Sequence, residues 1–295
     1  MIKGSIVAII TPMKVSGAID EEAFLRLIAW HLQEGAQGVV VLGSTGEGIT
    51  ILAEERARLI QLAISHVQGK VPVIVGTGSA STAQSIEFTK QAKELGADAA
   101  LLVTPYYNKP TQQGLIEHFK AIAKAISFPQ IVYNVPGRTC CDMLPMTVAK
   151  LAATCPEVIG VKEATGRVER VKELKALDCH IAQWSGDDLT ALDFVLEGGD
   201  GVITVVGNVA PRAMATLCQQ ALAEHSESAR NINEKLIDLH VKLFVESNPI
   251  PTKWLLAHLG MIQPGIRLPL TPLSERYHEA VKKAFLKSQE IKFET

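Results

Sequence analysis

The strongest constraint on the fold is an alternation of short apolar runs with longer amphipathic segments over the first 225 residues. Each run is apolar throughout, as in parallel strands that helices cover, and is followed by a segment with the apolar spacing of a helix. About eight such units favour an α/β fold, a closed (β/α)8 TIM barrel, over an open doubly wound sheet, although the residue count is compatible with both. The runs are SIVAIITP, GVVVLGST, VPVIVGTG, ADAALLVTPYY, PQIVYNVPG, VIGVKEATG, HIAQWSGDD and DGVITVVGN.

The alternation ends near residue 225, and three helix-like segments follow without a further strand pattern. They read ARNINEKLIDLHVKLFVE, IPTKWLLAHLG and LSERYHEAVKKAFLKSQ. No linker rich in proline, glycine or serine precedes them. We therefore expect a catalytic barrel over residues 1–225 and a C-terminal three-helix region over residues 226–295 that packs on it. A solenoid is the competing interpretation, but the units vary too much in sequence to favour it.

Composition excludes several classes of function. Charged residues make up 20% of the chain and the net charge is −2, so nothing favours nucleic acid or an anionic membrane. No apolar run approaches the roughly 18 residues of a membrane span, and MIKGSIVAIITPMK predicts a first strand instead of a signal peptide. Five cysteines without a CxxC motif are typical of a reducing cytoplasm. The histidines show no metal-ligand spacing, so we expect no metal.

Polar residues follow the apolar runs, at what would be the carboxyl ends of the strands, where barrel enzymes place their active sites. The set offers one amine with several hydroxyls and phenols, and it includes no histidine. Such groups suit carbonyl chemistry through an imine and suit hydride or phosphoryl transfer poorly. The residues are Thr11, Ser44, Thr45, Glu47, Thr77, Thr104, Tyr106, Tyr107, Tyr133, Asn134, Lys162, Glu163, Ser185, Asp187, Asp188 and Asn208.

Lys162 is the most unusual of these residues, because VIGVKEATG places it inside a predicted buried strand. A lysine side chain has an ordinary pKa near 10.4, and burial lowers this value by up to several units. The neutral amine can then form a Schiff base with a ketone. A strand lysine can also reach water or pair with a carboxylate, although Glu163 would point to the opposite face. Residue type and position leave both interpretations open.

Each of the other candidate site residues could instead have a purely structural role. The turn GSTGEG can hold a carboxylate on its backbone N–H groups, or it is an ordinary turn; without GK[ST] or GxGxxG it does not indicate a nucleotide. Tyr133 could shuttle a proton through the hydroxyl groups of Thr45 and Tyr107, or it could pack in the core. Arg138 could bind a carboxylate with two hydrogen bonds, or it could lie in an exposed loop.

In their order and spacing, GSTGEG, TPYYNKP, YNVPGRT, GVKEATG, SGDD and GVITVVGN resemble the motifs of the dihydrodipicolinate synthase family. This family belongs to the pyruvate-dependent class I aldolases, which include N-acetylneuraminate lyase. The resemblance covers essentially the whole chain. It implies a barrel with a C-terminal helical region and a homotetramer built as a dimer of tight dimers. It also implies that no cofactor is needed, because the lysine imine accepts the electrons.

The resemblance also implies catalytic roles. Lys162 would form the imine with pyruvate, and Tyr133 would be the acid/base group. Thr45 and Tyr107 would complete a proton relay, the latter by reaching into the neighbouring subunit's site. The implied substrate-binding residues are Ser44 and Thr45 for the pyruvate carboxylate, Gly186 and Ile203 for the pyruvate pocket, and Arg138 for the carboxylate of L-aspartate 4-semialdehyde.

The implied product is 4-hydroxy-tetrahydrodipicolinate, in the diaminopimelate route to lysine. Arg138 favours this short carboxylate-bearing aldehyde over the polyol tail that a sister aldolase, acting on N-acetylneuraminate or a 2-oxo sugar acid, must bind. A catalytically silent barrel that binds 2-oxo acids would not need the amine. A dinucleotide oxidoreductase is disfavoured because no GxGxxG follows the first strand.

One departure from the family pattern concerns regulation. Members that lysine inhibits bind it through a serine, two histidines, an asparagine and a glutamate. Without those side chains, and with an arginine that would repel the ammonium of the ligand, this chain is predicted to show weak or absent feedback inhibition by lysine. In an ungapped register the corresponding residues are Gly48, Ala53, Arg56, Ala80 and Gln84.

Overall fold

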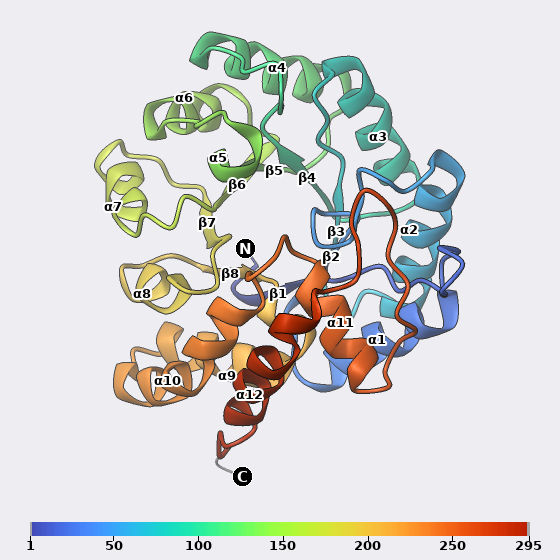
Figure 1. Cartoon of the computed structure of the whole chain (residues 1–295). Coiled ribbons are helices and arrows are strands. Elements are labelled where there is room, and N and C mark those ends of the chain that lie inside the picture. The colour runs from blue at the N-terminus through green and yellow to red at the C-terminus, as the bar shows by residue number, and fades with distance from the viewer. Residues whose placement is uncertain (1, 294–295) are drawn as a thin grey trace.

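The computed structural model describes residues 2–293, within which eight parallel strands close into a barrel in chain order. Each strand pairs with the next, and the last pairs with the first (Figure 1). The predicted (β/α)8 barrel is therefore confirmed, and the open sheet and the solenoid are wrong. The strands are β1 Gly4–Ala8, β2 Gly38–Val41, β3 Val73–Gly76, β4 Ala99–Val103, β5 Gln130–Asn134, β6 Val158–Glu163, β7 Ala182–Ser185 and β8 Gly201–Thr204.

Helices follow the strands and surround the barrel (Figure 1). Side chains cap the starts of α1 and α3: the side chain of Asp20 accepts from the backbone N–H of Ala23, and that of Ser81 accepts from the backbone N–H of Gln84. The helices of the barrel are α1 Glu21–Gln33, α2 Ala53–Val67, α3 Thr82–Glu94, α4 Gln112–Ala125, α5 Pro136–Thr139, α6 Pro145–Thr154, α7 Glu169–Ala176, α8 Ala191–Leu196 and α9 Pro211–Leu222, with a 3-10 turn η1 at Val206–Asn208.

Two apolar layers explain why the strands are apolar throughout. In β1, Ile6 and Ala8 point into the barrel, where they belong to a cluster that also contains Ile131, Tyr133 and Trp184. Val7, between them, belongs to the larger cluster that lies between the sheet and the helices. Successive strand residues thus enter different cores, and both cores are apolar.

After β8 and α9, the described chain continues with α10 Ser226–Lys242, α11 Ile250–His258, the 3-10 turn η2 Glu275–Tyr277 and α12 His278–Ser288. Helix α10 packs against α9 and α12, beside the barrel (Figure 1). The eighth strand–helix unit is complete at Leu222, which supports a division into a barrel at 1–225 and a helical region at 226–295; this division stays a proposal. Among residues 2–293, no helix is long and apolar enough to cross a membrane.

Candidate active site

The strand register brings Lys162 and Tyr133 together. They are paired residues of the neighbouring strands β6 and β5, near the carboxyl ends of both. Both side chains are buried, and the Nζ atom of Lys162 lies 4.3 Å from the centre of the Tyr133 ring. The amine and the phenol that the sequence singled out therefore meet at the end of the barrel where active sites of this fold lie.

Burial lowers the pKa of Lys162 to about 7. The charge of Asp188 opposes this change and the Arg138 guanidinium adds to it. Gly186 allows the lysine stem to pack against the backbone of the strand end, because a Cβ at this position would lie 2.9 Å from Cε of Lys162. At neutral pH about half of the amine is uncharged, which is the form that attacks a ketone.

Tyr133 is a buried phenol whose pKa is raised by that burial, while Arg138 and a hydrogen bond with Ser44 act in the opposite direction. The hydroxyl next to Tyr133 is thus the one on Ser44. Thr45, the next residue, is buried and its Oγ1 accepts a hydrogen bond of 2.9 Å from Nδ2 of Asn248. The part of Thr45 in a proton relay stays a prediction, and Ser44 is a further candidate for it.

Arg138 and Tyr107 occupy different surroundings. Arg138 belongs to the short helix α5, and its Nη2 donates to the backbone oxygen of Asn248 at 3.1 Å. It lines a cavity of about 540 Å³ together with Ser44 and Tyr133. Tyr107 follows β4 with φ of 73° and is 94% exposed, so its own chain does not bring it to Tyr133. Its predicted reach into a neighbouring subunit is compatible with this exposure and stays a prediction.

Two other predicted residues, Ile203 and Gly186, do not line this cavity. Ile203, in β8, is buried in the inner cluster that also contains Tyr133 and Trp184. Gly186 follows β7 and contacts the lysine stem, as described above. Within residues 2–293, no group of three His, Cys, Asp or Glu side chains is arranged to hold a metal ion.

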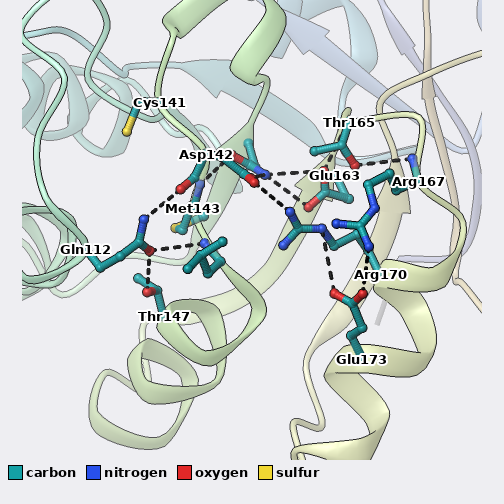
Figure 2. A network of polar contacts seen from close by, with 12 residues as sticks. Gln112, Cys141, Asp142, Met143, Thr147, Glu163, Thr165, Arg167, Arg170 and Glu173 are labelled. Atoms are coloured by element: carbon teal, nitrogen blue, oxygen red, sulfur yellow. Dashed lines mark hydrogen bonds and ion pairs between the residues drawn. The ribbon is translucent and has the colours of Figure 1, made fainter.

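Asn134 and Glu163 form the next pair in the register, and successive strand residues alternate between the two faces of the sheet. Glu163 belongs to a polar network with Asp142 and Arg170 (Figure 2). Nδ2 of Asn134 donates to Oδ1 of Asp142 at 2.8 Å and to Oε2 of Glu163 at 3.2 Å. Nη2 of Arg170 donates to Oδ2 of Asp142 at 2.7 Å. Burial raises the pKa of Glu163, and the Asn134 hydrogen bond opposes this rise. The network ties β5, β6 and α7 to the loop after α5.

Sequence reasoning listed Asn134 and Glu163 as strand-end residues but missed this network. It correctly placed Glu163 on the face opposite Lys162, so the glutamate is not the partner of the lysine. Figure 2 shows Asp142 between Gln112 on one side and Glu163 and Arg170 on the other. The motif YNVPGRT ends three residues before Asp142, and nothing in the spacing signals the contact.

The C-terminal region contributes to the site as well, which the sequence did not indicate. The backbone N–H of Arg267 and the Nζ atom of Lys253 both donate to the carboxylate of Glu47 in the turn GSTGEG. Lys253 and Glu47 are almost fully buried. With Asn248 bound to Thr45, these contacts hold the turn from the side of α11. Lys253 and Asn248 lie about 200 residues from the turn, so no local pattern could find them.

An amine of lowered pKa beside a buried phenol, at the carboxyl end of a (β/α)8 barrel, defines a Schiff-base-forming aldolase as the class of protein. The model of the dihydrodipicolinate synthetase family matches residues 1–288, and the chain belongs to this family. The resemblance carried by the six motifs is thereby confirmed.

Relatives match this chain over almost its whole length. The 4-hydroxy-tetrahydrodipicolinate synthase of Coxiella burnetii is 54% identical over 96% of this chain and 97% of its own, and that of Methylococcus capsulatus is 52% identical over 96% and 98%. A crystal structure of a chloride-inhibited dihydrodipicolinate synthase from Acinetobacter baumannii, complexed with pyruvate, is 49% identical with a TM-score of 0.96, over 99% of this chain and 100% of that one. The Thermotoga maritima enzyme gives the same TM-score at 41% identity, over 99% and 100%.

Proposed function

We propose that this chain condenses pyruvate with L-aspartate 4-semialdehyde to give 4-hydroxy-tetrahydrodipicolinate, in the diaminopimelate route to lysine. The observation that carries the proposal is the buried Lys162, with a pKa of about 7, beside Tyr133. The full-length relatives bear the name of this synthase, which supports it over a sister aldolase acting on N-acetylneuraminate or a 2-oxo sugar acid.

The first half of the reaction uses the uncharged amine. Lys162 attacks the keto carbon of pyruvate, a C–N bond forms and the keto oxygen leaves as water. The protonated imine draws electrons from the methyl group, which loses a proton and leaves an enamine. Asp188 lies close enough for its charge to raise the pKa of the lysine, so the same carboxylate stabilises the imine cation. Tyr133 and Ser44 offer the hydroxyl groups through which protons move.

The second half joins the two substrates. The enamine carbon attacks the aldehyde carbon, and the aldehyde oxygen takes a proton, for which the phenol of Tyr133, whose ring lies beside Lys162, is a candidate donor. Arg138, at the cavity wall, supplies a guanidinium for the carboxylate of the semialdehyde. The amine of the semialdehyde then attacks the imine carbon and loses a proton, the C–N bond to Lys162 breaks and the six-membered ring leaves with its hydroxyl group.

Assembly and location belong to the same proposal. A homotetramer built from tight dimers is supported by the exposure of Tyr107 and of the apolar Ile49 and Leu52, which suits contact with a second copy. A cytoplasmic location is supported by the five cysteines, all within the described residues and all free. Sedimentation of the purified chain measures the assembly state directly.

Borohydride reduction in the presence of pyruvate tests the function. We expect one reduced adduct per chain, on the peptide that contains Lys162. Lys253 is the matched internal control, because it is equally buried but ion-paired with Glu47, and it should stay unmodified. No adduct, or an adduct elsewhere with full turnover in Lys162→Arg, would refute the proposal.

A further inference from the structure

Asn248 contacts Thr45 and Arg138, which the family resemblance predicts to bind different substrates. It lies between α10 and α11, is 4% exposed and lines the cavity. Its side-chain Nδ2 donates to Oγ1 of Thr45 at 2.9 Å, whereas its backbone oxygen accepts from Nη2 of Arg138 at 3.1 Å. The side chain therefore acts on Thr45 alone, and the backbone serves Arg138.

The hydrogen bond from Asn248 restricts the direction in which the hydroxyl of Thr45 can donate its own proton. A hydroxyl has one proton to donate and two lone pairs that accept. Because the amide N–H of Asn248 occupies a lone pair, the proton of Thr45 has to point elsewhere, and among the described residues Oγ1 of Thr45 makes no other hydrogen bond. A buried hydroxyl fixed as a donor suits an anionic group of a substrate.

A neighbouring ion pair holds the turn that carries Thr45, next to the Asn248 amide. Lys253, one turn into α11, pairs with Glu47, two residues after Thr45 in the same turn. The amide oxygen of Asn248 is buried and meets no donor among the described residues. The side chain is therefore used through its nitrogen, at the cost of an unsatisfied oxygen.

We propose that Asn248 is a positioning residue, whose amide fixes the Thr45 hydroxyl as a hydrogen-bond donor to the pyruvate carboxylate. The proposal rests on the proposed function and on the prediction, implied by the family resemblance, that Thr45 holds this carboxylate. It assigns to the C-terminal region a specific part in binding the first substrate.

The decisive variant is Asn248→Asp, which has the same shape and the opposite polarity. An ionised carboxylate accepts only, so it draws the Thr45 proton to itself and repels pyruvate. For charges about 6 Å apart at an effective dielectric constant of about 20, half-maximal imine trapping needs about 100-fold more pyruvate. A protonated carboxyl donates as the amide does. The defect, taken relative to wild type at each pH, is therefore expected to shrink as pH falls through the carboxyl pKa, which burial raises above about 4.

Two matched variants separate positioning from a loss of structure. Asn248→Leu removes the donor without adding charge and should raise the required pyruvate concentration about tenfold at every pH. Asn231→Asp adds the same charge on the exposed face of α10 and should change nothing. Because Arg138 contacts the backbone of Asn248, the KM for the semialdehyde should stay within about twofold of wild type in the two variants that add no charge near Arg138, Asn248→Leu and Asn231→Asp.

The outcomes are distinct. Unchanged pyruvate affinity in Asn248→Asp at neutral pH would mean that the amide oxygen of Asn248 faces Thr45. This result would overturn the inference and leave the proposed function intact. A defect that is equal at all pH values and extends to the semialdehyde would reveal a merely structural role and overturn it too. If Asn248→Asp does not fold, the tenfold effect in Asn248→Leu carries the test, and its absence refutes the inference. A wild-type chain that forms no imine would refute the proposed function and this inference with it.

Discussion

Replacing Asp188 by asparagine should change the pH at which Lys162 becomes reactive. Asp188 is 2% exposed and lies just after β7. Its carboxylate accepts hydrogen bonds from the Thr204 hydroxyl and from the backbone N–H groups of Val205, at 2.8 Å, and Val206, at 3.2 Å. Burial raises its pKa to about 6, so at pH 7 it is mostly ionised and favours the charged form of Lys162. The change Asp188→Asn would keep the shape of the side chain and remove its charge.

The expected size of the effect follows from the pKa of about 7 for Lys162. About half of the wild-type amine is neutral at pH 7, against about 0.04% for a free lysine side chain. Removal of one buried charge at an effective dielectric constant of about 20 lowers the midpoint by about one to two pH units. At pH 6 the initial rate of imine formation should then rise about fivefold over wild type, and above pH 8.5 the two proteins should react at similar rates.

The assay is imine formation with pyruvate, trapped by excess reductant and measured by intact mass between pH 5.5 and 9.5. Asp187→Asn is the matched control, because Asp187 is the adjacent carboxylate and its charge raises the pKa of Asp188, whereas the charges that act on Lys162 are those of Asp188 and Arg138. Thermal unfolding of each variant checks that the fold persists. A wild-type midpoint near pH 10 would show that burial does not lower the pKa of Lys162. The same midpoint in Asp188→Asn and wild type would show that the charge of Asp188 does not act on the lysine.

Four further outcomes are expected. Arg138→Ala should raise the KM for the semialdehyde at least tenfold, while imine formation with pyruvate persists at pH 8. Loss of imine formation in this variant would contradict the role assigned to Arg138. Millimolar lysine should leave the rate unchanged, because Arg56 takes the place of a ligand-binding side chain, and strong inhibition below 1 mM would refute this. Glu47→Gln should cost about 3–5 kcal/mol in urea unfolding by leaving Lys253 buried without its partner, and adding Lys253→Met should recover most of it. Lys162→Met should raise the free energy of unfolding by about 5 kcal/mol at pH 6, because the folded wild-type protein has to bury a charged amine there. This gain in stability should fall between about pH 7 and 10.5, where the lysine is protonated in the unfolded chain but neutral in the folded protein. A gain that does not depend on pH would contradict the lowered pKa of Lys162.

The barrel could be predicted from the sequence because each strand is recognisable by its own apolar run. Residues such as Ile6 and Val7 are both apolar because one faces the inside of the barrel and the next faces the helices. Lys162 was conspicuous for the same reason, since a charged side chain interrupts a run in which both faces are dry. Tyr133 was a candidate for the same site because it lies at the carboxyl end of another apolar run, PQIVYNVPG.

The hydroxyl chemistry around Tyr133 was less accessible to sequence reasoning. Ser44 and Thr45 are adjacent in a turn, and the motifs assigned the relay to Thr45. The structure places Ser44 against Tyr133 and turns Thr45 toward Asn248. Which of two neighbouring hydroxyls faces the phenol depends on the backbone of the turn, and residue type does not report it.

The sequence by itself determined the eight-stranded barrel, the family and the lysine, because these depend on patterns that are local or repeated along the chain. The tertiary structure decided which side chains surround that lysine. Asp188 and Asn248 act through charge and hydrogen bonds across segments far apart in the chain, and such interactions depend on distance in space. The number of residues that separate two positions in the sequence does not indicate how close they lie in the folded barrel.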